Sequence, residues 1–197
     1  MTAVSREEFD RALATARNSS ERTLHIGALL QKAMGREVIV VGGSAIDVYA
    51  TGRMPSLDVD LVTERAAAIP VLQGWGFSNR QGRTWRRADL AVDIDLVPGE
   101  LTGSLRRSPT FQTPYGPVRV LGVEDLVLKR LAELQHWESS RERRIQLVEQ
   151  LDMLLARPGF DQAYLDEMAP KQNVVRILAD FRSRAREAER YGRLRRE

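Results

Sequence analysis

The spacing of apolar residues changes along the chain, from a mixture of strand-like and helical patterns to one that is helical throughout. Short apolar or alternating segments predict strands or hairpins at residues 37–41, 57–62, 76–87, 89–97 and 111–121. Apolar residues at helical spacing predict helices at residues 5–34, 42–52, 64–75, 124–137, 140–156 and 161–169, and in the C-terminal tail.

Local signals indicate where these segments begin and end. Ser5 and Glu8 form a capping box at the start of a region that holds one or two amphipathic helices up to about Met34. Gln81 and Gly82 are typical of a hairpin turn. Breaks between the later helices are expected at Ser139, at Pro158 to Gly159 and at Pro170. The pattern therefore predicts an α/β (α+β) fold, with a mixed sheet of about five strands flanked by helices in residues 1–122 and a helical bundle with a basic tail in residues 123–197.

Two of the predicted strands carry aspartates at alternate positions, Asp58 with Asp60 and Asp93 with Asp95. Residues two apart on a strand share one face, so each pair of carboxylates is close together. An isolated pair is more often a partly solvated strand face, but two pairs in one small domain favour a site for a hard divalent cation such as Mg²⁺. Either Asp93 or Asp95 supplies the third carboxylate, depending on the register of the two strands.

Gly42 and Gly43 follow the apolar strand at residues 37–41 and precede a helix. Such a glycine pair lets the backbone approach a phosphate at the helix N-terminus, although by itself it also suits a sharp strand-to-helix turn. The chain contains no GxxxxGK[ST] motif, so the segment is not a P-loop. Together with the aspartate strand that follows, the glycine pair predicts binding of a nucleoside triphosphate.

Composition excludes several classes of site. The 197 residues include no cysteine and two histidines, which excludes disulfides and leaves too few soft ligands for a structural zinc site. No apolar run approaches the roughly 20 residues that a membrane span needs, and the first residues lack the apolar core of a signal peptide. We therefore expect a cytoplasmic protein with no membrane partner.

The basic residues are almost all arginine: of 30 lysines and arginines, three are lysines, which leaves 27 arginines. A genome rich in G and C explains part of this excess, and phosphate binding is the other interpretation. The C-terminal helix could be a solvated face, or it could bind RNA through its arginines. The predicted RNA-binding residues are Arg182, Arg186, Arg190 and Arg193.

These motifs resemble the nucleotidyltransferase superfamily related to DNA polymerase beta, over about residues 37 to 157. The matching segments are Val41-Gly42-Gly43, Asp58-Val59-Asp60-Leu61 and the strand with Asp93 and Asp95. The spacer of residues 44–57 is like the GGxAID branch, which includes some aminoglycoside nucleotidyltransferases. GRMPSLDVDL (residues 52–61) is similar to MenT-type and AbiEii-type toxins of bacterial toxin–antitoxin systems.

The resemblance implies roles for individual residues. Mg²⁺ would be bound by Asp58, Asp60 and Asp95, with Asp93 as the alternative third ligand. Lys129 and Asp152 match functional positions in the helical half of the toxins, where Lys129 would contact phosphate. The implied nucleotide-binding residues are Gly42, Gly43, Ser44, Arg53, Ser56 and Lys129.

By the same resemblance, the chain is expected to transfer nucleotides from an NTP to the 3′ end of tRNA and so block translation. A cognate antitoxin would neutralise it, and some antitoxins of this family look like kinases, which makes Ser56 a candidate regulatory phosphosite. Two alternatives stay open. One is transfer to a small molecule, as in the aminoglycoside-modifying relatives, or to a protein hydroxyl, and the other is a non-catalytic RNA-binding module.

Overall fold

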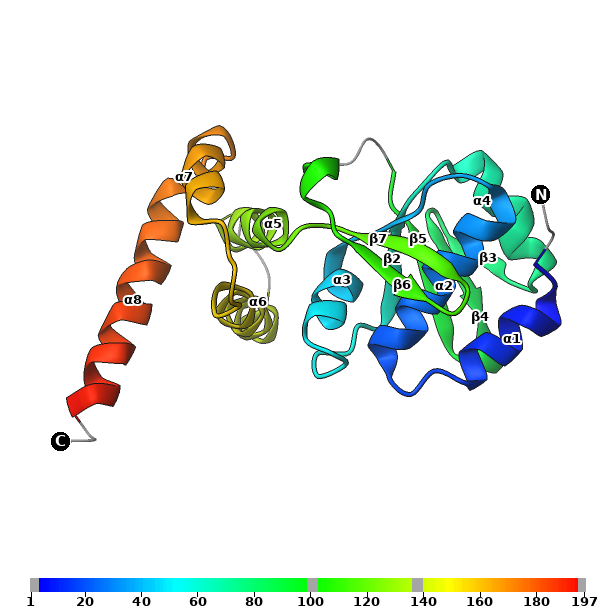
Figure 1. Cartoon of the computed structure of the whole chain (residues 1–197), viewed down its shortest axis with the longest axis horizontal. Helices are drawn as coiled ribbons and strands as arrows, with labels where there is room; N and C mark the ends of the chain where they lie inside the picture. The colour runs from blue at the N-terminus through cyan, green and yellow to red at the C-terminus, as the bar shows by residue number, and fades with distance from the viewer. Residues whose placement is uncertain (1–3, 99–102, 136–139, 195–197) are drawn as a thin grey trace. The chain divides into compact units, whose positions relative to one another are not determined.

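The computed structural model describes residues 4–98, 103–135 and 140–194, with side chains up to Arg184. It forms two compact units, which we call the sheet unit (Met1–Val123) and the helical unit (Glu124–Glu197) (Figure 1). The described residues contain eight α-helices and a seven-stranded mixed sheet, so the predicted α/β fold class is confirmed.

The sheet has the strand order β3-β4-β5-β2-β1-β7-β6. Its strands are β1 (Ile39–Val40), β2 (Asp58–Val62), β3 (Ser78–Gln81), β4 (Thr84–Arg87), β5 (Val92–Leu96), β6 (Thr110–Thr113) and β7 (Gly116–Val120). The expected number of about five strands was too low. Both predicted hairpins, β3–β4 and β6–β7, join the same sheet, one at each edge.

The centre of the sheet combines parallel and antiparallel pairs. β2 runs parallel to β5 and antiparallel to β1, and β4 runs antiparallel to β5. The predicted strand at residues 89–97 begins later than expected, because Ala88–Leu90 forms a 3₁₀ turn and Ala91 has a φ of 49°. The parallel register of β2 and β5 places Asp58 opposite Asp93 and Asp60 opposite Asp95.

Alternation along β2 and β5 gives the sheet two different faces. Val59, Leu61, Ile94 and Leu96 are buried in the core, so we call their side the core face. The four aspartates at 58, 60, 93 and 95 point to the opposite side, which we call the acidic face. The strands are thus apolar enough to be held in the core while carrying charge on their other side.

The helices of the sheet unit are α1 (Arg6–Ala14), α2 (Ser19–Met34), α3 (Gly42–Tyr49) and α4 (Arg65–Gly74). The Ser5 hydroxyl accepts the N–H of Glu8 at 3.1 Å, which is the Ser5 half of the predicted capping box, while the Glu8 carboxylate accepts a hydrogen bond from Lys32 at 2.8 Å. Helix α2 packs closely on the sheet at Gly27, where a Cβ would lie 2.8 Å from Val118 Cγ2 (Figure 1). Only glycine permits this approach without a shift of the neighbouring side chain.

The helical unit contains α5 (Val123–Gln135), α6 (Arg141–Leu155), α7 (Gln162–Lys171) and α8 (Val175–Leu194). Ser140 and Asp161 cap α6 and α7 through their side-chain oxygens. The break expected at Pro170 comes later, because Pro170 lies within the last turn of α7 and Asn173 turns the chain with a φ of 57°.

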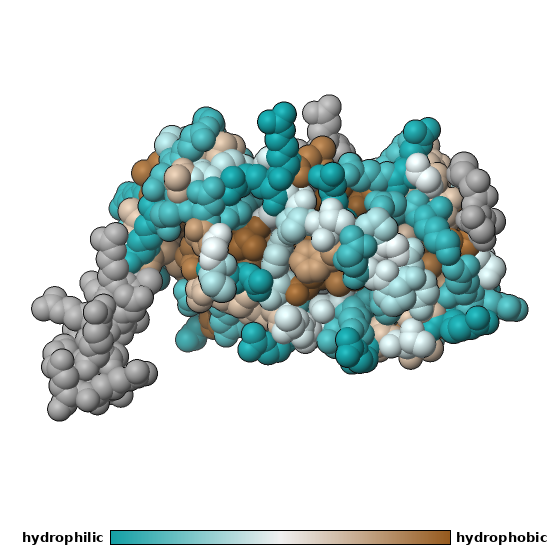
Figure 2. All heavy atoms as spheres, in the orientation of Figure 1, coloured by the Kyte–Doolittle hydropathy of each residue, from teal (hydrophilic) through white to brown (hydrophobic). Residues whose placement is uncertain are grey.

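No helix among the described residues is both long and apolar enough to cross a membrane, and the surface seen in Figure 2 is mostly hydrophilic.

Candidate active site

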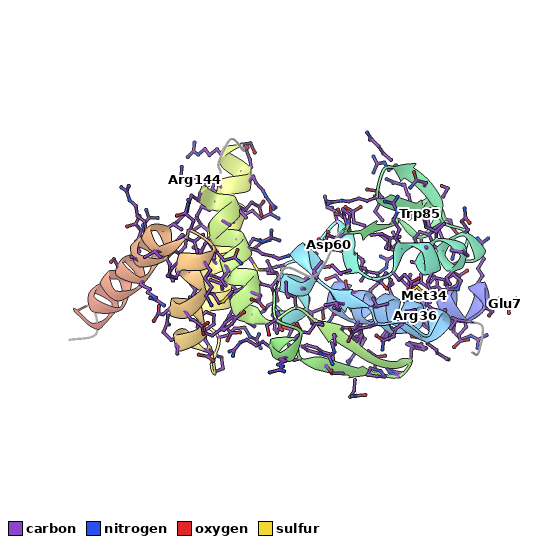
Figure 3. The ribbon with its side chains drawn as sticks, turned by 90° about the horizontal axis from the view of Figure 1, so that it is seen from above. Glu7, Met34, Arg36, Asp60, Trp85 and Arg144 are labelled. Atoms are coloured by element: carbon purple, nitrogen blue, oxygen red, sulfur yellow. The ribbon has the colours of Figure 1, made fainter. Side chains whose placement is uncertain are left out.

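Three carboxylates of the acidic face form a compact cluster, the acidic triad, made of Asp58, Asp60 and Asp95. One oxygen from each lies within 4.8 Å of the others. Asp58 and Asp60 stand on β2, and the parallel neighbour β5 brings Asp95 beside Asp60. Figure 3 shows the Asp60 position in the sheet unit. The two predicted pairs therefore lie side by side, as a shared cation site requires.

The glycine pair holds Asp60 in place. Gly42 has a φ of 61°, and a Cβ there would lie 2.2 Å from Asp60 Oδ2. The N–H of Gly43 donates to the same oxygen at 3.0 Å. Ser44 Oγ accepts the Asp60 N–H at 3.0 Å and donates to the Val41 carbonyl at 2.9 Å. The close approach that glycine permits here is thus to a carboxylate of the triad, at the N-terminus of α3.

Asp95 and Asp93 have different partners in the β3–β4 hairpin. Asp95 accepts hydrogen bonds from Arg83 Nε at 2.9 Å and from Thr84 Oγ1 at 2.6 Å, and it belongs to the triad. Asp93 instead pairs with Arg80 and Arg86, at 3.4 and 3.3 Å. The geometry therefore favours Asp95 as the third carboxylate, and Asp93 acts as a partner for the arginines.

The electrostatics of the triad suit a hard cation. Desolvation raises the pKa of Asp58, the nearby Asp95 and Asp93 carboxylates raise it further, and Arg83 opposes them. Carboxylate oxygens are the ligands that Mg²⁺ prefers in proteins, and the charge of a bound cation would offset the repulsion among these crowded carboxylates. On this donor set, Asp58, Asp60 and Asp95 fit the predicted metal.

The loop between α3 and β2 depends on a residue that the sequence did not single out. Asp47 in α3 is 1% exposed, and its Oδ1 accepts the Met54 N–H at 3.1 Å. Its Oδ2 is buried without a hydrogen bond within the described part of the chain. Arg53, in the same loop, donates through Nε to the Ala50 carbonyl at 3.1 Å. A charged residue within the apolar helix pattern of GGSAIDVYA was the available signal.

Ser56 lies in the same loop and lines a pocket of about 410 Å³. Leu57, which follows it, forms a bend before β2 begins at Asp58. Ser56 and Asp58 would share one face only on an extended backbone, and the bend at Leu57 interrupts that backbone. The pocket is otherwise lined mainly by the α1–α2 connection, the first residues of α2 and the start of β5, including Asn18, Arg22 and Val92.

The remaining predicted residues belong to the helical unit. Lys129 lies half-buried on α5, and Asp152 on α6 has a pKa raised by desolvation and lowered in part by Arg184. Arg182 forms an ion pair with Asp166 at 2.6 Å. The functional roles of Lys129 and Asp152 and the RNA-binding role of Arg182 stay predictions. Arg186, Arg190 and Arg193 fall in α8, but their side chains lie outside the described residues.

Two solved structures are similar to this chain in fold. A crystal structure of an antigenic nucleotidyltransferase-like protein from Paracoccidioides brasiliensis matches with a TM-score of 0.56, covering 85% of this chain and 94% of that one. The chain has a nucleotidyltransferase-like fold. The solution structure of the antibiotic-resistance factor ANT(2'')-Ia matches with a TM-score of 0.50, covering 87% and 96% of the two chains. Sequence identity is 17% in both, so the likeness is one of nucleotidyltransferase-like fold. No protein-family model and no curated protein sequence matches the chain.

Proposed function

We propose that this protein is a Mg²⁺-dependent nucleotidyltransferase. The observation that carries the proposal is the acidic triad, three carboxylates within 4.8 Å on one face of a nucleotidyltransferase-like sheet. The N-terminus of α3 adjoins the triad through Gly43 and Asp60, so phosphate groups and carboxylates can meet at one place when a cation lies between them. This arrangement supports catalysis of nucleotidyl transfer better than it supports phosphate binding without catalysis.

The reaction follows from the charges of the site. Asp58, Asp60 and Asp95 would hold Mg²⁺, which would neutralise charge on the triphosphate and lower the pKa of the acceptor hydroxyl. The acceptor oxygen forms a bond to the α-phosphorus, the bond from that phosphorus to the β-phosphate oxygen breaks, and pyrophosphate leaves with the electron pair. A carboxylate of the triad accepts the hydroxyl proton. Arg53 and Lys129 are the proposed nucleotide contacts. Ser44, which was also expected to contact the nucleotide, is fully buried, and its hydroxyl is bound to Asp60 and Val41 instead.

We further propose the 3′ end of tRNA as the acceptor, with the protein acting as a translation-blocking toxin. The similarity of residues 52–61 to toxin nucleotidyltransferases and the 27 arginines among 30 basic residues support this substrate. An antitoxin would then be required as a partner. If that antitoxin is a kinase, Ser56 is its proposed target, and Ser56→Asp should abolish labelling of tRNA, whereas Ser56→Ala should not.

The test is incubation of the protein with Mg²⁺, total tRNA and each labelled NTP in turn. We expect label on tRNA with at least one NTP, and loss of that label in Asp58→Asn. Asp180→Asn is a matched control, because Asp180 is exposed on α8 in the other unit. Wild-type labelling by Asp58→Asn would refute the metal site. RNA binding without any labelling would support the non-catalytic alternative.

A small-molecule acceptor is the second candidate. It is supported by the similar fold of the antibiotic-resistance factor ANT(2'')-Ia. The same assay with an aminoglycoside in place of tRNA separates the two candidates, because only the true acceptor should become labelled and cause the NTP to release pyrophosphate. Label on a polypeptide would indicate a protein hydroxyl instead.

The basic tail can be tested separately from the triad. Truncation after Arg184 retains Phe181, which is buried, and the ion pair of Arg182 with Asp166. It removes the predicted RNA-binding arginines that follow. We expect weaker tRNA binding with a shallower salt dependence, because counterion release scales with the number of phosphates contacted. Unchanged binding at each salt concentration would assign the tail another role.

A further inference from the structure

Three arginines of the β3–β4 hairpin lie beside the acidic triad, and we call Arg80, Arg83 and Arg86 the arginine row. Their side chains are 59%, 51% and 42% exposed, so each guanidinium can still reach a ligand. Thr84 and Arg86 are the β4 residues opposite Asp95 and Asp93 on β5, which places the row on the acidic face. The row arises from a hairpin that the catalytic motifs do not include.

The formal charge of this face is close to balance. Four carboxylates, at positions 58, 60, 93 and 95, stand against the three guanidinium groups of the row, which leaves a charge of −1. A single divalent cation at the triad would change that charge to +1. The same surface therefore repels phosphate before a cation binds and attracts it afterwards.

Arg83 is hydrogen-bonded to Asp95, a carboxylate that the cation would need as a ligand. It donates through Nε to Asp95 Oδ2 at 2.9 Å, while Thr84 takes Asp95 Oδ1 at 2.6 Å, so both oxygens of this carboxylate are engaged. Asp95 is itself 5% exposed, which leaves it little room to turn toward solvent. A guanidinium and a divalent cation on one carboxylate repel each other, so the two compete for Asp95.

We propose that the arginine row is a phosphate-binding surface that the metal switches on: cation binding at the triad displaces Arg83 from Asp95, and the freed guanidinium joins Arg80 and Arg86 in binding substrate phosphates. The inference rests on the proposed nucleotidyl transfer, in which the NTP carries phosphates and the acceptor receives a nucleotidyl group. The proposal gives the hairpin a ligand, the substrate phosphates. It also predicts that metal binding and phosphate binding strengthen each other.

The first experiment measures the cation alone. Mn²⁺ is a spectroscopic probe for carboxylate sites of this kind, and its dissociation constant can be measured by electron paramagnetic resonance without any substrate. Arg83→Gln keeps a hydrogen-bond donor beside Asp95 and removes the charge, so we expect Mn²⁺ affinity to rise about tenfold. Arg83→Lys retains the charge and should stay near the wild-type affinity.

Arg36→Gln is the matched control for a lost ion pair. Arg36 pairs with Glu64 at 3.3 Å, and it lies well apart from Asp60 in Figure 3. This variant should leave Mn²⁺ affinity unchanged. An Arg83→Gln protein whose Mn²⁺ affinity is unchanged or lower, while its thermal unfolding matches the wild type, would overturn the proposed competition.

The second experiment measures phosphate ligands with and without Mn²⁺, using fluorescent single-stranded RNA and a non-hydrolysable triphosphate nucleotide as separate arms. Mn²⁺ should strengthen binding in at least one arm, and the double variant Arg80→Gln/Arg86→Gln should lose about tenfold in that arm only when Mn²⁺ is present. The arm that responds identifies which substrate the row contacts. No response of either arm to these substitutions would overturn the phosphate role.

Neither experiment requires catalytic turnover, so the two proposals can fail separately. Competition between Arg83 and Mn²⁺ without labelling of any acceptor would retain the switch and refute nucleotidyl transfer. Conversely, labelling that depends on Asp58, together with RNA and nucleotide binding that does not change when the arginine row is substituted, would retain the transferase and refute the switch.

Discussion

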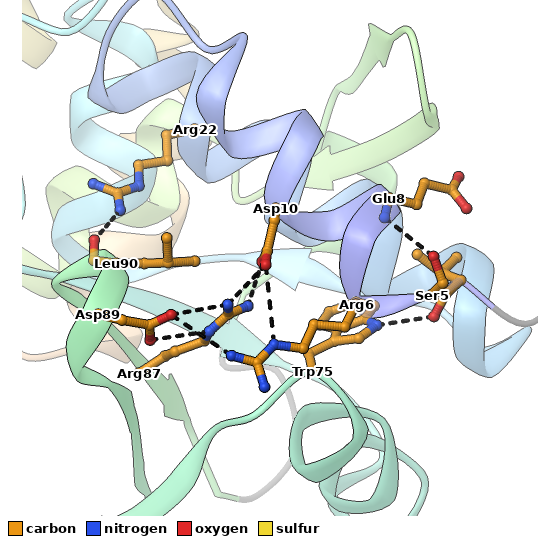
Figure 4. Close-up of polar contacts among 10 residues, drawn as sticks. Ser5, Arg6, Glu8, Asp10, Arg22, Trp75, Arg87, Asp89 and Leu90 are labelled. Atoms are coloured by element: carbon orange, nitrogen blue, oxygen red, sulfur yellow. Dashed lines mark hydrogen bonds and ion pairs between the residues drawn. The ribbon is translucent and has the colours of Figure 1, made fainter.

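Two arginine–aspartate clusters flank strand β4, and they differ in how their charges are balanced. On one side Arg87, 2% exposed, binds Asp10 and Asp89 with all of its donor nitrogens, and Arg6 pairs with the same two carboxylates (Figure 4). Two positive and two negative groups are thereby matched. On the other side the four aspartates of the acidic face exceed the three arginines of the row, and three of them crowd within 4.8 Å.

The comparison separates a cluster with balanced charge from one with unbalanced charge, both made of the same residue types. The Arg87 cluster joins α1 to β4 and the turn at Ala88–Leu90, and its hydrogen bonds satisfy a charge that burial would otherwise make costly. On the acidic face, desolvation raises the pKa of Asp58, and the unmatched negative charge of the neighbouring aspartates raises it further. A cluster that the fold leaves incomplete is the one that can accept a cation.

Removing a carboxylate from the incomplete cluster should have the largest effect, and on activity rather than stability. Asp60→Asn is expected to reduce nucleotidyl transfer by about 10³-fold or more, because a metal ligand and its charge are lost. The free energy of unfolding should stay the same or rise, since a crowded like charge is removed. Rates from labelled product and unfolding curves in denaturant measure both quantities, and a large loss of stability would contradict a cation-binding role.

Gly42→Ala should affect the triad through the backbone. A non-glycine residue at a φ of 61° costs about 1–2 kcal/mol, and the added Cβ would lie 2.2 Å from Asp60 Oδ2, which must then move. Gly159→Ala is the control, because Gly159 has a φ of 77° and no atom within 4 Å of an added Cβ. Both variants should lose stability in thermal unfolding, but only Gly42→Ala should also lose transfer and Mn²⁺ binding.

Asp10→Asn tests the balanced cluster and should show the opposite behaviour to Asp60→Asn. It removes one of two carboxylates from the buried Arg87 guanidinium, and breaking a fully buried pair costs about 3–5 kcal/mol. Asp10 is itself partly exposed and Asp89 remains, so we expect about 2 kcal/mol. Transfer per folded molecule should be unchanged. A stability equal to the wild type would show that the cluster is dispensable.

The two clusters should also respond to pH with opposite signs. The pKa of Asp89 is lowered by its hydrogen bond to Arg87, so its stabilisation is present above the ordinary Asp pKa and is lost as pH falls through the lowered folded value. Desolvation raises the pKa of Asp58, so its destabilisation is present above the raised folded pKa and disappears as pH falls below the unfolded value.

Unfolding of Asp89→Asn and Asp58→Asn across pH, with chelator present, checks these signs. At neutral pH Asp89→Asn should be less stable than the wild type, and Asp58→Asn should be as stable or more stable. Both differences should shrink toward zero in acid, where the wild-type carboxylates are protonated. Differences of the same sign at neutral pH would remove the distinction between the clusters.

The local features of this protein follow from its amino-acid sequence alone. Alternation along LDVDLV and VDIDL put each aspartate pair on one face of its strand, and apolar spacing located most helices. Hydrogen bonding between Ser5 and Glu8 was likewise visible in the residues alone. These features depend on neighbours within a few positions, which is why reading along the chain recovers them.

The residues that meet across the sheet follow from the folded structure. The register that places Asp60 beside Asp95, the joining of both hairpins to one sheet, and the pairing of Asp93 with Arg80 and Arg86 all depend on how the segments pack together. A shift of one residue would turn either pair to the other face, and a shift of two would exchange Asp93 for Asp95 at the triad. Strand pairing is a long-range choice made by the packing of the whole sheet, so a local pattern could supply both candidates but not select between them.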